Sequence, residues 1–341
     1  KEVKEYFNIL SNEFPEWLLE YIDTPEMKRI GKVSLSCGKD YTKVFDVKYF
    51  YSNLDHSVGV ALIIWNFTKD KRQTLAGLFH DIAVPAFKHV LDFMSKDYEK
   101  QESIEEKTTD IIMNSKEIMF LLKRDGINPE EVINYKIYPI ADNEVPRLSA
   151  DRLEYNFSAG LTLKRVWEIN DIKECYSDIT ILKNENDIEE LGFQNKSICE
   201  KYISTVSNLW PVWISSSDKV VMQFLADIIK RMEEEKYICK DDLYKLSEKE
   251  VINKIINCEN KYISDKFKTF QRTRKTYESD FLIDDKYCVA IKVKKRYVDP
   301  LCISDNIVER ISASSLDSKN KIEEFLNINS KRYAYFDFNF K

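Results

Sequence analysis

Hydrophobic residues in the first half of the chain recur mainly at the three- and four-residue spacing of helices. Residues 57–67 are apolar on nearly every face, which is typical of a helix that is buried on all sides. Asp70 is a suitable N-cap for a second helix, whose apolar residues Leu75, Leu78 and Phe79 fall at helical spacing. Together the patterns predict an amphipathic helix pair within residues 1–25 and helices over 57–67, 71–81, 101–113, 115–124, 129–135 and 149–167.

In two places the pattern changes to the alternation that is typical of strands. Val33 and Leu35 precede Gly38, and alternating apolar residues follow it, so we expect a short hairpin within residues 31–51. Residues 287–298 alternate apolar and basic side chains and predict one amphipathic strand. Further helical patterns lie between about 180 and 260, including 220–234 and 247–256, and at the end of 308–326.

These elements predict a mainly α protein with a smaller C-terminal α+β region. A chain of 341 residues can form one large domain or two ordinary ones. Only 7 Gly and 8 Pro are present, which disfavours architectures that need many tight turns. We expect a core with N-terminal helices over 1–180, a helical extension packed on it over 181–265, and the α+β region over 266–341. The boundary near 265 rests on the change in pattern alone.

Charge and cysteine content restrict the class of protein. Lys and Arg number 52 against 58 Asp and Glu, so a net charge of −6 repels polyanions and gives no general support for nucleic-acid binding. The seven cysteines are scattered without a C-x-x-C motif, so we expect reduced thiols rather than a disulfide framework. No apolar run is long enough for a membrane span. We therefore expect a cytoplasmic protein without a membrane partner.

The three histidines restrict any histidine-based chemistry to a short stretch of the chain. His56 opens the buried helix, His80 and Asp81 close the next one, and Asp151 begins the helix after residue 149. Burying imidazoles and carboxylates at the ends of apolar helices is costly unless they are paired or bind a metal. Two His and two Asp form a mixed nitrogen and oxygen set that suits Mn, Fe, Zn or Co. The alternative is that each is a single polar group with a local partner.

The sequence around these residues carries a resemblance. His56-Ser57-x-Gly59-Val60, Leu75-Ala76-Gly77-Leu78-Phe79-His80-Asp81-Ile82 and Ala150-Asp151-Arg152-Leu153-Glu154-Tyr155 resemble the H…HD…D signature of the HD-domain metal-dependent phosphohydrolases. The order and flanking residues are most similar to the deoxynucleoside triphosphate triphosphohydrolase branch. The resemblance is clear over about 45–170 and fainter over 180–300. It implies an HD-domain helical bundle, with the short hairpin before it and the α+β region after it.

The resemblance also implies roles for individual residues. His56, His80, Asp81 and Asp151 match the ligands of a divalent ion, which could be Mn, Fe, Mg, Zn or Co. His89 and Asp92 match the pair that faces the scissile phosphate in that branch. Arg152 takes the place of a basic residue against the phosphates and Tyr155 that of an aromatic against the sugar. Lys88 is a further cation near the motif. The partners implied are a nucleotide or small phosphorylated substrate and further copies of the chain in a homo-oligomer.

Three positions depart from the family pattern. The chain continues His80-Asp81-Ile82-Ala83-Val84-Pro85, so the usual middle histidine is Val84 and both glycines are replaced. The arginine expected three positions before the first ligand is Asn53. The His-Glu pair that supplies a proton donor is reduced to Glu105. We therefore expect His89, Asp92 or Glu105 to act as the general acid or base. The alternatives are that the substrate differs or that activity has been lost.

Three hypotheses follow. The first is a metal-dependent phosphohydrolase that acts on a nucleotide, with deoxynucleoside triphosphates among the candidates, or on a related phosphate ester. The second is a degenerate HD protein that binds a nucleotide or metal as a sensor or interaction module. The third is the binding of single-stranded nucleic acid, which the net charge disfavours. It would use the basic and aromatic residues interleaved between Lys266 and Tyr277 and the basic run from Lys292 to Arg296.

Overall fold

The computed structural model describes residues 1–94, 101–290, 294–329 and 332–341, and describes 101–105 by their backbone alone. The helices up to residue 177 are α1 (Glu2–Leu10), α2 (Glu16–Ile22), α3 (Pro25–Ile30), α4 (Asn53–Thr68), α5 (Lys71–Phe79), α6 (Val90–Met94), α7 (Gln101–Asn114), α8 (Lys116–Arg124), α9 (Glu130–Ile133), α10 (Ala150–Thr162) and α11 (Ile169–Ser177), with the 3-10 helices η1 (Lys39–Tyr41) and η2 (Tyr135–Ile137). The later helices are α12 (Lys196–Val206), α13 (Trp210–Trp213), α14 (Ser216–Glu234), α15 (Lys240–Lys245), α16 (Glu248–Ile256), α17 (Lys261–Arg272), α18 (Ile311–Ser314) and α19 (Leu316–Leu326). The mainly helical fold is thus confirmed, including the N-terminal helix pair.

The strands form two small sheets. They are β1 (Ile179–Lys183), β2 (Glu189–Phe193), β3 (Tyr277–Ser279), β4 (Cys288–Val289), β5 (Leu301–Ser304), β6 (Ile307–Arg310) and β7 (Tyr333–Tyr335). One sheet has the order β1-β2-β5-β6, with β2 and β5 parallel and the other pairs antiparallel. The other has the order β3-β7-β4 and is antiparallel.

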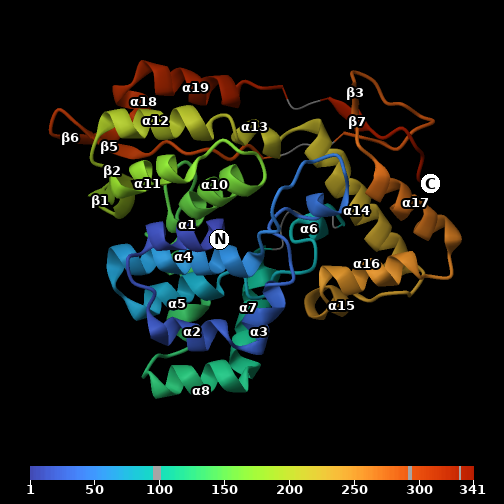
Figure 1. Ribbon diagram of the computed structural model, residues 1–341, viewed down its shortest axis with the longest axis horizontal. Helices are drawn as coiled ribbons and strands as arrows, with labels where there is room; N and C mark the ends of the chain where they lie inside the picture. Colours follow the sequence, from blue (N-terminus) through green and yellow to red (C-terminus); the bar gives the residue numbers. More distant parts are fainter. Residues whose placement is uncertain (95–100, 291–293, 330–331) are drawn as a thin grey trace.

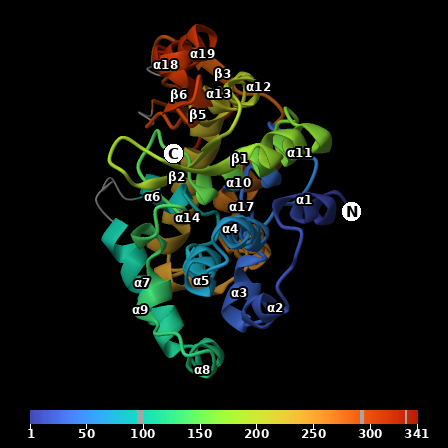
Figure 2. The same ribbon diagram turned by 90° about the vertical axis from the view of Figure 1, so that its left-hand side faces the viewer.

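The helix α4 lies inside the first hydrophobic cluster, with α5 and α10 packed against it (Figure 2). Ser52 begins α4 with a capping box, because its hydroxyl accepts from the Asp55 amide and the Asp55 carboxylate accepts from the Ser52 amide, both at 3.0 Å. A Cβ on Gly77 of α5 would lie 2.3 Å from Cδ1 of Ile64, so the glycine allows the close contact of α4 and α5. These three helices carry the predicted metal ligands or end beside them.

A second hydrophobic cluster forms around α14, on the right in Figure 1. Phe224 of α14 contacts five aromatic rings, which belong to Phe270, Tyr287, Phe336, Phe338 and Phe340. The C-terminal part of the chain is divided between the clusters, since β5, β6, α18 and α19 pack with the first and β3, β4 and β7 with the second. The boundaries at 180 and 265 stay predictions, because each cluster draws residues from both sides of 265.

The predicted hairpin within 31–51 is wrong. That segment contains turns, η1 and an isolated bridge between Ser34 and Ser52. Two backbone hydrogen bonds, from Leu35 to Tyr51 and from Asn53 to Val33, accompany the bridge and do not extend into a ladder. The Ser34 backbone pairs with side chains instead: its amide donates to Glu248, 3.0 Å away, and its carbonyl accepts from Asn53. The alternating apolar residues enter different clusters, as Leu35 packs in the first and Phe45 against the second.

Two further expectations about strands need correction. The described residues of 287–298 form only the two-residue strand β4, and 291–293 lie outside the described residues. Tyr287 is buried in the second cluster and Val298 in the first, so the segment crosses from one to the other rather than staying in one sheet. The helical pattern after 180 begins only at α12, since β1 and β2 form a hairpin before it.

No helix in the described ranges combines the length and apolarity of a membrane span. The seven cysteines are free, as the sequence predicts.

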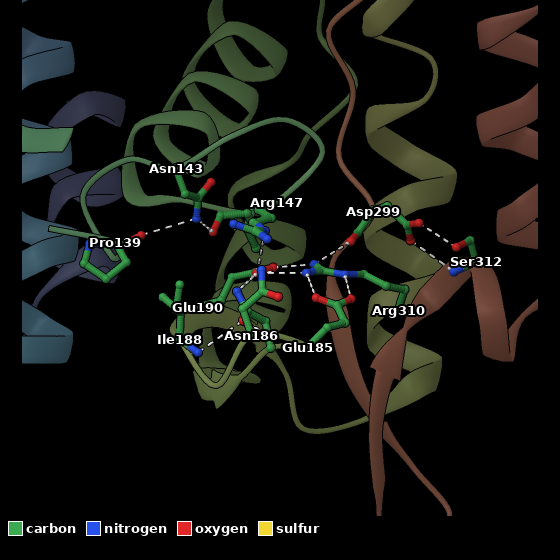
Figure 3. A network of polar contacts seen from close by, with 12 residues as sticks. Pro139, Asn143, Arg147, Glu185, Asn186, Ile188, Glu190, Asp299, Arg310 and Ser312 are labelled. Carbon is green, nitrogen blue, oxygen red and sulfur yellow. Dashed lines mark hydrogen bonds and ion pairs between the residues drawn. The ribbon is translucent and has the colours of Figure 1, made fainter. Parts of the chain in front are cut away.

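A network of charged side chains joins the four-stranded sheet to the loop before α10 (Figure 3). Glu190 of β2 is fully buried and accepts from Asn184 at 3.1 Å and from the Arg310 guanidinium of β6 at 3.0 Å. Arg310 also pairs with Glu185, and Nε of Arg147 in the loop lies 3.9 Å from Glu190 Oε1. The carboxylate of Glu190 therefore holds three segments together.

Replacing Glu190 by alanine is expected to lower the free energy of unfolding by about 3 kcal/mol, because the substitution leaves the Arg310 guanidinium partly buried with one partner fewer. Urea unfolding measures the change. Lys319→Ala is the matched control, because it breaks a pair exposed by 51% and 54% and should cost less than about 1 kcal/mol. Equal losses in the two variants would contradict the role of Glu190.

Candidate metal centre

The first predicted ligand lies in the first turns of α4. His56 is buried, and its Nε2 lies 2.9 Å from Oδ1 of Asp151 on α10. The capping box at Ser52 fixes where α4 begins and so fixes the direction of the imidazole. Nδ1 faces the other way, 3.3 Å from Oε2 of Glu154.

The second histidine follows the end of α5. Nδ1 of His80 lies 2.6 Å from the carbonyl oxygen of Gly77, which places the proton on Nδ1. The lone pair of Nε2 is then available to a metal ion. Nε2 lies 3.4 Å from Oδ2 of Asp81 and 3.7 Å from Oδ1 of Asp151. The backbone carbonyl of the helix end thus directs His80 toward the two carboxylates.

Asp151 completes the group. Its position at the start of α10 follows from Ser149, whose hydroxyl accepts from the Arg152 amide as the N-cap. Oδ2 of Asp151 accepts a hydrogen bond of 2.9 Å from the Tyr135 hydroxyl, while Oδ1 faces the imidazoles. One donor atom each from His56, His80 and Asp151 lies within 4.8 Å of the others.

Asp81 lies beside this group. Within the described part of the chain its buried Oδ2 accepts no hydrogen bond of normal geometry. The nitrogen atoms that face Oδ2 are His80 Nε2 at 3.4 Å and Lys88 Nζ at 3.3 Å. A buried carboxylate oxygen that accepts no hydrogen bond and lies beside the imidazoles is available to a bound cation.

The charges at the centre perturb one another. Burial alone would lower the pKa of His56, but the carboxylates of Glu154 and Asp151 raise it to about 9. His80 is also buried, and Asp81 and Asp151 outweigh that effect and raise its pKa. Burial favours the neutral acids, yet the imidazoles hold the pKa of Asp81 and of Asp151 below the usual range. The carboxylates therefore create a field that favours positive charge.

The residues present fit a divalent ion. Two imidazole nitrogens and carboxylate oxygens converge from three helices, and each imidazole has its other nitrogen directed at an oxygen, which is the usual arrangement of metal-binding histidines. A mixed nitrogen and oxygen set accepts Mn, Fe, Zn or Co and does not select one of them.

The loop that carries Lys88 is held against the centre from the second cluster. Phe87 and Lys88 have φ values of 63° and 50°, in the left-handed region. The Phe87 amide donates to the buried carboxylate of Glu248 at 2.7 Å, and the same carboxylate accepts from Ser34 and Tyr41. Glu248 thereby helps to fix the turn that brings Lys88 to Asp81.

His89 and Asp92 form a pair directly after Lys88. Nδ1 of His89 lies 3.1 Å from Oδ2 of Asp92, and the two side chains are 42% and 56% exposed. Tyr155 lies closer to the ligands, with its ring 6.1 Å from that of His56 and 5.2 Å from that of Trp213. The predicted roles of these residues stay predictions.

The other predicted substrate residues have structural partners. Asn53 is fully buried, and its amide donates to the carbonyls of Val33 and Ser34. The Arg152 guanidinium donates to the carbonyl oxygens of Arg147 and Asn143, so it holds the loop before α10. Glu105 belongs to α7, but its side chain lies outside the described residues.

Three contributors to the centre have no role in the sequence analysis. Glu154 follows Asp151 by three residues, and this spacing places both on one face of a helix, so the sequence held a signal for it. Tyr135 and Glu248 contact the centre or its loop only through the tertiary fold, and no local pattern could have identified them.

Comparison with known proteins gives distant relatives, and no family model matches the chain. It is 23% identical to the uncharacterized protein YdhJ of Bacillus subtilis over 84% of this chain and 85% of that protein. It is 25% identical to the metal-dependent phosphohydrolase cns2 of Cordyceps militaris over 40% of this chain and 39% of that protein. A solved structure of a hypothetical protein from Aquifex aeolicus has a TM-score of 0.67, with 17% identity, over 95% of this chain and 93% of that one. The partial match to cns2 supports the resemblance to the HD superfamily, and the last comparison shows a shared fold.

A pH dependence follows from Glu248. Burial raises the pKa of Glu248 from 4.5 to about 7, although three hydrogen bonds oppose the effect. The folded protein then binds the proton more tightly than the unfolded chain, so this group's contribution to stability falls as the pH rises from about 4.5 to about 7. This group should make the free energy of unfolding of the native protein fall between pH 5 and pH 8. In Glu248→Gln the fall should be smaller by up to about 3 kcal/mol. Urea unfolding with a chelator present checks this, and equal pH slopes in both proteins would refute it.

Proposed function

We propose that this chain is a metal-dependent phosphohydrolase of the HD type, acting on a nucleotide or a related phosphate ester. The observation that carries the proposal is the convergence of His56, His80 and Asp151 within 4.8 Å, with Asp81 and Lys88 beside them. The name of the relative from Cordyceps militaris supports the reaction class. The deoxynucleoside triphosphate branch rests on the sequence resemblance alone.

The chemistry divides between the bound ion and the side chains. His56, His80, Asp81 and Asp151 would hold a divalent ion, which would supply Lewis acidity and lower the pKa of the hydrolytic water. Lys88 supplies a positive charge beside Asp81, where it can neutralise a phosphoryl oxygen. His89, oriented by Asp92, is the candidate proton donor to the leaving oxygen. The ring of Tyr155 supplies an apolar face for the sugar next to the ligands.

A second candidate is a degenerate HD protein that binds a metal or nucleotide without turnover. Asn53 and Arg152, which the resemblance places against the phosphates, are engaged with backbone carbonyls. Val84 stands where the resemblance expects a histidine. These observations favour a binding module because they reduce the groups available to clamp a phosphate.

His80→Ala and Asp81→Ala are expected to remove both bound metal and phosphohydrolase activity, with turnover falling at least about 100-fold. The assay is a panel of nucleoside triphosphates and monophosphates with Mn²⁺, Mg²⁺, Co²⁺ or Fe²⁺, together with metal analysis of the purified protein. Lys319→Ala is the control.

The outcomes separate the two candidates. Metal-dependent turnover that the two variants lose establishes the enzyme. Metal binding without turnover on the whole panel favours the sensor. Full metal occupancy in the His80→Ala, Asp81→Ala double variant would refute the site itself.

A further inference from the structure

Glu154 is a buried acid next to the metal centre. It lies on α10, one turn after Asp151, and its side chain is fully buried. Oε1 accepts a hydrogen bond of 2.6 Å from the Tyr51 hydroxyl. A buried carboxylate without a cation or several donors is costly, so its retention here requires a partner for the second oxygen.

The partner of that oxygen is His56. Oε2 of Glu154 lies 3.3 Å from Nδ1 of His56. Neither atom meets the geometry of a hydrogen bond with any partner within the described ranges, so this ion-pair contact is the polar contact that the structure gives to both. The opposite nitrogen, Nε2, faces Asp151. The imidazole therefore lies between two carboxylates that project from the same face of α10.

The facing helix leaves room for this carboxylate. Gly59 lies on α4, three residues after His56, and a Cβ there would lie 2.7 Å from Cγ and 2.9 Å from Oε1 of Glu154. Glycine in a helix interior costs about 1 kcal/mol relative to alanine. The close approach of Glu154 explains why glycine stands at this position despite that cost.

We infer that Glu154 is a positioning residue, whose carboxylate holds the proton of His56 on Nδ1 and so directs Nε2 at the metal. The inference deepens the proposed function and rests on its metal site. Tyr51 is the next link, since its hydroxyl fixes the rotation of the carboxylate. Carboxylates behind metal-binding histidines fix the tautomer and raise the basicity of the ligand, and their loss weakens metal binding 10- to 100-fold.

The test uses Co²⁺ alone, titrated into the full chain by visible absorption and by competition with a chelator. Glu154→Gln keeps the size of the side chain and removes its charge, and it is expected to weaken Co²⁺ binding about 10- to 100-fold. The melting temperature of the metal-free variant should stay near that of the native protein. Binding within twofold of the native protein would overturn the inference.

Gly59→Ala is the second variant, and it changes the identity of no predicted ligand and not that of Glu154. Because the new methyl group displaces the carboxylate, we expect weaker Co²⁺ binding although alanine favours the helix. This variant decides the matter if Glu154→Gln does not fold, and unchanged binding by it would then overturn the inference. A native chain that binds no Co²⁺ refutes the proposed metal site, whereas native binding that survives both substitutions refutes only the role of Glu154.

Discussion

The centre of this protein depends on one electrostatic constraint, which is the meeting of three carboxylates and two imidazoles between α4, α5 and α10. Such a group is stable in a buried place only if its charges compensate one another or a cation joins them. The helix caps at Ser52 and Ser149 and the Gly77 carbonyl at the end of α5 meet this requirement by orienting the side chains. The geometry is therefore set mainly by where helices begin and end.

Buried carboxylates also organise the surroundings of the centre. Glu248 accepts from the turn after Val33, from Tyr41 and from the loop that carries Lys88. Glu190 joins the β1-β2 hairpin to β6 and to the loop before α10. In each case one buried carboxylate supplies acceptors to segments that are far apart in the sequence. A chain with few glycines and short strands connects its irregular segments in this way.

The sequence predicted those parts of the structure that depend on neighbouring residues. The helices α4, α5 and α14 follow from apolar spacing, with Asp70 as the predicted N-cap of α5. All three are present, although α4 and α14 begin four residues before their predicted starts at 57 and 220. The meeting of His56, His80 and Asp151 followed from a resemblance, since residues nearly 100 positions apart carry no local sign of contact. The hairpin within 31–51 and the strand over 287–298 failed because alternation alone does not show whether a partner strand exists. Tyr135 and Glu248 were missed for the same reason, as only the packed fold gives them their partners.

The position of β7 has a consequence for how the protein folds. This strand lies between β3 and β4, and residues 336–340 complete the aromatic group around Phe224. During synthesis the two outer strands emerge first and have no central strand to pair with. The aromatic part of the second cluster around Phe224 must therefore wait for residues 333–340 before it closes. The helices of the first cluster that bear His56, His80 and Asp151 can pack earlier, because their contacts with one another lie within the first 170 residues.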